Sequence, residues 1–133
     1  MNAPAQLSPD PTFYRSPAEA AAAPAEKLAY VVAFDRLAQR PDALTVLDVD
    51  PGSPRYGQVV GWAELPTLGD ELHHFGWNAC SSALAHAGHD THGLQRRYML
   101  LPGLRSSNVY VYDTQPDPSA PTLVKTIDAK ELA

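Results

Sequence analysis

Short runs of apolar and β-branched residues recur along the first half of the chain. Residues 27–34 (KLAYVVAF) and 43–50 (ALTVLDVD) are apolar segments of strand length, and residues 57–65 (GQVVGWAEL) form a third such segment. DRLAQRPD between the first two contains turn residues, and the second runs into DPGSPRYG, a cluster of Pro, Gly, Ser and Asp. The pattern predicts a hairpin followed by a third strand.

A second group of similar segments occupies the C-terminal part of the chain. Residues 97–101 (RYMLL), 108–113 (NVYVYD) and 122–127 (TLVKTI) have the composition of strands, and PGLRSS and the proline-rich TQPDPSAP separate them. This group predicts another meander. Between the two groups, residues 71–80 follow neither a helical nor a strand period.

The spacing of these segments predicts an all-β chain of antiparallel meanders. LTVLDVDPGSPRYGQVV and VYVYDTQPDPSAPTLVKTI share one order, in which a strand that ends in Asp runs into a Pro-rich turn and a further strand. Repeats of several strands are typical of the blades of a β-propeller. One or two blades do not close a ring, so we expect part of a propeller, with open strand edges that allow self-association.

Proline and alanine dominate residues 1–26, and the prolines interrupt any long helix there. We expect a mostly loose, flexible arm at 1–26 and one β domain at 27–133, because 133 residues suit a single domain. The sequence contains no signal-peptide pattern and no apolar run approaching the roughly 18 residues of a membrane span. These features favour the cytoplasm, with the periplasm as the alternative.

The charge and the cysteine count exclude several classes of protein. A net charge of −5 and a pI near 5.4 give no electrostatic reason to expect nucleic acid or an anionic membrane as a partner. No G-x-S-x-G, P-loop or dinucleotide-binding fingerprint is present, so hydrolase and nucleotide-dependent functions have no support. The single cysteine excludes an intrachain disulfide.

The irregular segment DELHHFGWNACSS, at residues 70–82, concentrates the candidate chemistry. His73 and His74 supply imidazoles, which bind copper or zinc, and a thiolate from Cys80 would favour Cu(I) or zinc. Adjacent histidines on a regular strand point to opposite faces, so the two share one ion only where the backbone is irregular. The alternative is a pair of structural histidines without a metal.

The neighbours of the histidines also have two interpretations each. Asp70 or Glu71 orients an imidazole by accepting its second N–H, or both are solvated charges, which is the interpretation that we favour. Cys80 is a ligand or redox-active thiolate, or an inert buried thiol, which is the commoner case. Trp77 is expected to pack in the interior.

Three further histidines form the pattern H-x-x-H-x-x-H at His86, His89 and His92. A helix would place His86 and His89 near one face, but the glycines at 88 and 93 favour a flexible loop. We interpret this stretch as an exposed loop with adventitious metal affinity rather than as a dedicated site.

Four longer segments together resemble a known family. They are LDVDPGSPRYGQVV at 47–60, DELHHFGWNACSS at 70–82, LLPGLRSSNVYVYD at 100–113 and APTLVKTI at 120–127. In this order they resemble the N-terminal part of the selenium-binding protein family, whose bacterial members include copper-dependent methanethiol oxidases. The resemblance covers about residues 26–133 of this chain but only the first quarter to third of a family member.

The resemblance implies a seven-bladed β-propeller that converts methanethiol, oxygen and water to formaldehyde, hydrogen sulfide and hydrogen peroxide. It implies copper as the cofactor and methanethiol as the substrate of the full-length protein. The paired histidines of the family's ELHH motif correspond to His73 and His74, and further ligand histidines belong to segments beyond this chain.

The chain departs from the family at two positions. Gly57 stands where the family has the cysteine that is proposed to hold selenium, which makes selenium binding doubtful here. Ala83 replaces a second cysteine found in some relatives and leaves Cys80 alone.

The leading hypothesis is therefore the N-terminal piece of a methanethiol oxidase, inactive alone, with half of a copper site. The rival hypothesis is a non-catalytic small β binding or structural domain, or a truncated gene product, whose histidines decorate a loop. Metal content and peroxide release from methanethiol, measured in this chain and in longer products of its reading frame, discriminate the two.

Overall fold

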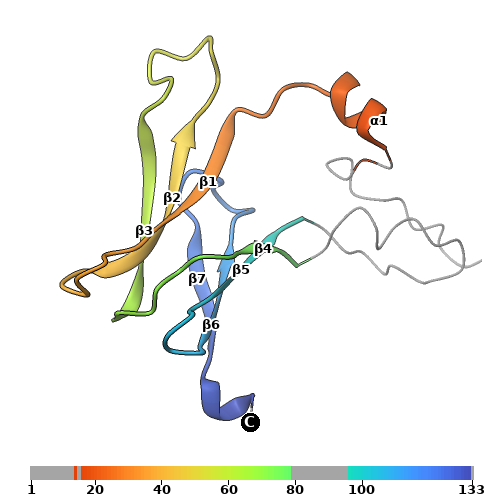
Figure 1. The fold of residues 1–133 in the computed structure, drawn as a ribbon. Helices are drawn as coiled ribbons and strands as arrows, with labels where there is room; N and C mark the ends of the chain where they lie inside the picture. The colour runs from red at the N-terminus through yellow and green to blue at the C-terminus, as the bar shows by residue number, and fades with distance from the viewer. Residues whose placement is uncertain (1–13, 15, 79–95, 133) are drawn as a thin grey trace, which may run out of the picture.

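Strands account for most of the regular structure, so the chain is mostly β, as the sequence predicted, with two short helices in the described residues. The computed structural model describes residues 14, 16–78 and 96–132 (Figure 1). Its elements are α1 (Pro17–Ala22), β1 (Leu28–Ala33), β2 (Pro41–Asp48), β3 (Val59–Leu68), β4 (Gly76–Trp77), β5 (Tyr98–Pro102), β6 (Val109–Asp113), β7 (Thr122–Ile127) and the 3-10 helix η2 (Ala129–Glu131).

The strands form two antiparallel sheets, a three-stranded sheet β1-β2-β3 and a four-stranded sheet β4-β5-β6-β7. Both are meanders, because strands that follow one another in sequence are also hydrogen-bonded neighbours. The two sheets cross in the view of Figure 1, and the segment between β3 and β4 connects them. All the strands expected from the sequence are present, and β4 escaped prediction because two residues carry no detectable period.

One short helix, α1, lies inside the segment for which the sequence predicts a mostly loose arm. The Ser16 hydroxyl accepts a hydrogen bond from the backbone N–H of Glu19, and Pro17 occupies the first turn, where its missing N–H costs nothing. The helix ends at Ala22, two residues before Pro24. Residues 1–13 and 15 of the predicted arm lie outside the described residues.

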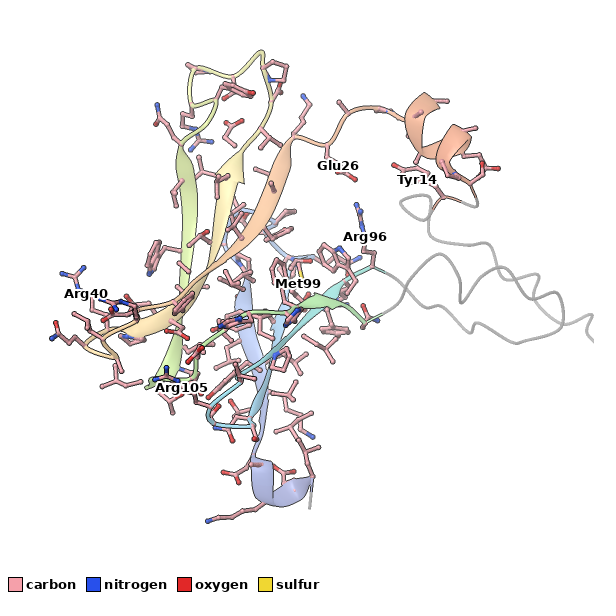
Figure 2. The ribbon with its side chains drawn as sticks, in the orientation of Figure 1. Tyr14, Glu26, Arg40, Arg96, Met99 and Arg105 are labelled. Atoms are coloured by element: carbon pink, nitrogen blue, oxygen red, sulfur yellow. The ribbon has the colours of Figure 1, made fainter. Side chains whose placement is uncertain are left out.

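The core lies between the two sheets. Its buried side chains come from both sheets and from the segment that connects them: Leu44, Leu65, Leu72, Met99, Leu101, Tyr110 and Tyr112. Figure 2 places Met99 in this space. Burial of each tyrosine ring contributes about 2–3 kcal/mol of hydrophobic stabilisation. The Tyr112 hydroxyl donates a hydrogen bond to the Glu64 carbonyl at 2.9 Å, and burial raises the pKa of Tyr112 to about 12.

Two fully buried carboxylates join the sheets to the connecting segment. Asp42 of β2 accepts hydrogen bonds from the backbone N–H of Leu72 at 2.9 Å and of Asp35 at 3.1 Å. Asp70 accepts hydrogen bonds from the Tyr110 hydroxyl at 2.6 Å and from the Thr67 hydroxyl at 2.5 Å. The start of the connecting segment is therefore bonded to both sheets at once. Charge-assisted bonds of this kind are stronger than neutral ones and offset the cost of burying the carboxylates.

We predict that Gly61→Ala lowers the free energy of unfolding by about 1–3 kcal/mol, because added volume in a packed interior causes strain. A Cβ at Gly61 would overlap the backbone carbonyl oxygen of Ser119, in the loop between β6 and β7, and lie 2.9 Å from the Val46 side chain. Urea unfolding measures the change. Gly76→Ala is the control, since a Cβ there meets nothing within 4 Å. Equal midpoints for the two variants would contradict the close approach of that loop to Gly61.

We also predict a pH dependence of stability that is due in part to Asp113. Its carboxylate receives two hydrogen bonds from the Arg97 guanidinium, at 2.9 and 2.5 Å, which hold the pKa of Asp113 below its ordinary value. A lowered folded-state pKa gives stability that is present above the unfolded-state pKa of about 3.9 and is lost as the pH falls through the folded-state value. In urea titrations, wild type should exceed Asp113→Asn in stability most at neutral pH, and the gap should close in acid. A gap that stays constant to pH about 2 would refute this role.

Candidate metal centre

Residues 70–77 alternate between the interior and the surface as they pass between the sheets. Leu72 is 1% exposed and forms an isolated antiparallel bridge with Gly103. Phe75 and Trp77 are partly buried and pack against the core cluster. The prediction that Trp77 packs in the interior is therefore confirmed. His73 and His74, by contrast, are both exposed.

The turn after β5 holds this segment in an unusual backbone conformation. Glu71 has a φ of 57°, the left-handed region, which costs a non-glycine residue about 1–2 kcal/mol. The N–H of Leu104 donates to the Glu71 carbonyl at 3.1 Å, and the N–H of Arg105 donates to the Asp70 carbonyl at 3.0 Å. The Arg105 guanidinium, labelled in Figure 2, also forms an ion pair with the Glu71 carboxylate. These contacts fix the backbone immediately before the histidines.

Glycine is required at the closest point of that turn. A Cβ at Gly103 would overlap the Ser106 hydroxyl and lie 3.2 Å from the backbone carbonyl oxygen of Asp70. The sequence predicts only a turn for the PGLRSS stretch at residues 102–107. In the structure this turn also hydrogen-bonds to the backbone of the residues that precede His73.

The two imidazoles lie side by side on the surface. Their ring centroids are 6.3 Å apart and the ring planes differ by 28°, while His73 also stacks on Phe34 with centroids 5.4 Å apart. Residues 73–75 belong to no strand. The two side chains are therefore not forced to opposite faces, as they would be on a regular strand. An irregular backbone at this point is what the sequence analysis required for the two histidines to share one ion.

A carboxylate contacts one of these rings. His73 Nε2 lies 3.0 Å from Glu71 Oε1, so Nδ1 is the nitrogen that remains for a metal ion. A carboxylate on the second imidazole nitrogen is the usual way in which proteins orient a histidine ligand. The donor set, two imidazoles with one oriented by a carboxylate, fits copper or zinc. The described part of the chain contains no group of three or more His, Cys, Asp and Glu side chains placed to hold an ion, so the set is incomplete.

The structure separates the roles of the two acidic residues. Asp70, which we expected to be a solvated charge or to orient an imidazole, is fully buried and bonded to Thr67 and Tyr110. The expectation of a solvated charge is therefore wrong for Asp70, because two hydroxyl donors from the sheets replace its water. Glu71 contacts both His73 and Arg105 and is also more than a solvated charge.

Cys80 and the predicted loop of His86, His89 and His92 lie outside the described residues. Their roles as a thiolate ligand, an inert thiol or an adventitious metal loop stay predictions.

Sequence reasoning missed a cavity of about 750 Å³. The cavity is lined by Trp77 and, among others, by Tyr30, Phe75, Arg96 and Thr114. The Arg96 guanidinium lies 5.3 Å from the centroid of the Trp77 ring and donates a hydrogen bond to Glu26 Oε1 at 3.0 Å. Figure 2 labels Glu26 and Arg96. Arg96 stands beside Arg97 in the sequence, but no motif or spacing there predicts a cavity. Neither His73 nor His74 lines this cavity.

Gly57, where the resemblance implies a cysteine in other family members, has a φ of 76° in the turn between β2 and β3. A Cβ there would meet nothing within 4 Å, so only the backbone conformation opposes a larger residue. No helix in the described residues is long and apolar enough to cross a membrane.

Comparison with known proteins gives consistent matches. The family described as 56kDa selenium binding protein matches residues 7–133. Selenium-binding protein 2 of Arabidopsis thaliana is 47% identical over 122 residues, which are 90% of this chain and 24% of the plant protein. Methanethiol oxidase of Mus musculus is 44% identical over 121 residues, which are 90% of this chain and 25% of the mouse protein.

A solved structure agrees with these matches. The X-ray structure of a hypothetical selenium-binding protein from Sulfolobus tokodaii has a TM-score of 0.85 and 48% identity, over 92% of this chain and 27% of that one. The chain spans about a quarter of the length of the curated relatives that it matches. The family match over nearly the whole chain, together with these relatives, shows that the protein belongs to the 56 kDa selenium-binding protein family.

Proposed function

We propose that this chain is the N-terminal portion of a copper-dependent methanethiol oxidase, to which it contributes two imidazole ligands. The observation that carries the proposal is the exposed pair of His73 and His74, with rings 6.3 Å apart and Glu71 bonded to one of them. Support comes also from the mouse relative, which is named methanethiol oxidase. The substrate is a small thiol, and the remaining ligands belong to a longer polypeptide.

The proposed architecture is the beginning of a β-propeller. Both sheets are antiparallel meanders, as the blades of a propeller are. The first sheet has three strands and the second has four, since the residues described before β1 contain no counterpart of β4. The edge of β1 at Leu28–Ala33 is therefore where a further strand would complete the first blade.

A copper ion held there would supply a thiophilic site for the substrate and redox chemistry toward oxygen. The net reaction balances with one water molecule: the methyl carbon is oxidised to formaldehyde, whose oxygen comes from water, sulfur leaves as hydrogen sulfide, and O2 takes up two electrons and two protons to form hydrogen peroxide. His73 and His74 would hold the ion. Glu71 accepts the second N–H of His73 and fixes its ring, while Arg105 fixes the Glu71 carboxylate. Selenium is not part of the proposal, because Gly57 replaces the cysteine.

We predict that His73→Ala and His74→Ala each abolish specific copper binding. The test is a copper titration of variants in which His86, His89 and His92 are already alanine, so that loop binding does not mask the loss. In the longest product of the reading frame, peroxide release from methanethiol should disappear together with the copper. Glu71→Gln, which keeps the size of the side chain, should weaken copper binding by about 10-fold or more.

The parent protein with only the loop histidines replaced is the control, and it should bind copper normally. Retention of copper and of turnover without either His73 or His74 would reject the proposal. It would leave the rival, a non-catalytic β domain with surface histidines, as the better description.

A further inference from the structure

The hydrogen bond to Glu71 fixes the His73 imidazole only in part. The His73 side chain is 40% exposed, and its Nε2 atom lies 3.0 Å from Glu71 Oε1. One hydrogen bond holds one atom of the ring, and the ring can still turn about the line that joins Nε2 to the carboxylate. The lone pair of Nδ1 lies in the plane of the ring and turns with it. A well-ordered ligand therefore needs a second contact, on the face of the imidazole.

Phe34 makes that second contact. Its ring is stacked on the His73 imidazole, with centroids 5.4 Å apart and ring planes that differ by 27°. This separation lies within the roughly 4.5–7 Å over which aromatic rings attract each other. Glu71 and Phe34 thus restrict the imidazole in different ways, because the carboxylate fixes the position of Nε2 and the phenyl ring fixes the plane.

The backbone that carries Phe34 is tied to the backbone that carries His73. Asp42, which is fully buried, accepts a hydrogen bond through Oδ1 from the N–H of Asp35 at 3.1 Å. Through Oδ2 the same carboxylate accepts a hydrogen bond from the N–H of Leu72 at 2.9 Å. Asp35 directly follows Phe34, and Leu72 directly precedes the histidine. One buried side chain of β2 therefore sets the spacing between the two rings.

The turn that begins at Phe34 is also fixed by hydrogen bonds of its own. The Asp35 carboxylate accepts hydrogen bonds, at 3.1, 2.8 and 3.0 Å, from the backbone N–H groups of Leu37, Gln39 and Arg40. Arg40, which Figure 2 labels, marks this turn in the structure. Phe34 is 47% exposed, but the backbone that follows it is held in one conformation.

The contact does not need a free sheet face. Further blades of a propeller would pack against the faces of the sheets. Phe34 follows the last residue of β1, and His73 lies in the segment between β3 and β4, so both rings lie beyond the ends of the strands. The stacked pair is therefore compatible with the longer polypeptide proposed above.

We propose that Phe34 is a positioning residue of the copper site, which holds the plane of the His73 imidazole so that Nδ1 is presented to the ion. The inference rests on the proposed function, because it takes His73 to be a copper ligand. A phenyl ring supplies no donor atom for copper, so Phe34 acts only through the imidazole. A ligand whose orientation is fixed before the ion arrives loses less freedom on binding, which raises the affinity.

The test is a copper titration of Phe34 variants of the longest product of the reading frame, with His86, His89 and His92 replaced by alanine. Phe34→Leu keeps an apolar side chain but removes the flat ring, and it should lower the copper affinity by about 3- to 10-fold, as expected for the loss of one aromatic pair. Phe34→Tyr keeps the ring and should retain the parent's affinity. Tyr56→Leu is the matched control, since it removes a ring that is 61% exposed in the turn between β2 and β3.

Electron paramagnetic resonance of bound Cu(II) gives a second measurement that is independent of turnover. The parent protein and Phe34→Tyr should each show one copper signal. Phe34→Leu should show a broadened signal, because the His73 ring then takes up several orientations. Circular dichroism establishes that each variant is folded.

Equal copper affinities for Phe34→Leu and Phe34→Tyr would overturn the inference, because the flat ring would then have no role. A loss in Tyr56→Leu as large as that in Phe34→Leu would overturn it in favour of a general effect of removing exposed rings. His73→Ala separates this inference from the proposed function. If it abolishes copper binding while Phe34→Leu binds normally, only the role of Phe34 is rejected. If it binds copper as the parent does, the proposed function is rejected and the role of Phe34 with it.

Discussion

The structure depends on the hydrogen bonds that a fully buried carboxylate, Asp70, receives from Tyr110 and Thr67. Burying a carboxylate without such donors would cost several kcal/mol of folding free energy. The burial of Asp70 therefore requires hydrogen-bond donors beside it. Thr67 belongs to β3 of the first sheet and Tyr110 to β6 of the second. One side chain in the connecting segment therefore ties the sheets together. Within the described residues, no buried side-chain polar atom lacks a hydrogen-bond partner.

The same junction determines what the next residues can do. Because Asp70 and Leu72 are fixed in the interior, Glu71 takes up a left-handed conformation between them, and the chain continues without strand geometry through His73 and His74. The two imidazoles then lie near each other on the surface instead of on opposite faces of a strand. The position of the candidate metal centre therefore follows from the way the two sheets are joined. Arg105 in the neighbouring turn contributes an ion pair with Glu71.

Local periodicity was enough to predict most strands, and Thr122–Ile127 agrees with its prediction residue for residue. Local periodicity did not predict β4, because its two residues are too few to show a period. They form a strand only through their pairing with β5. Asp70 was misjudged because its acidic neighbour made it look solvated, whereas its burial depends on Tyr110, 40 residues away. The approach of His73 to His74 likewise follows from tertiary contacts, so that only the residue types of the candidate site could be predicted.

The most direct test of this account is the copper affinity of Asp70→Asn, measured in the longest product of the reading frame with His86, His89 and His92 replaced by alanine. Asp70 is hydrogen-bonded to Thr67 and Tyr110, so the substitution acts on copper through the position of the segment and through the loss of one negative charge. The account predicts an affinity about 10-fold or more below that of the parent, in a protein whose circular dichroism stays native. An unchanged affinity would contradict the claim that the buried junction positions the histidine pair.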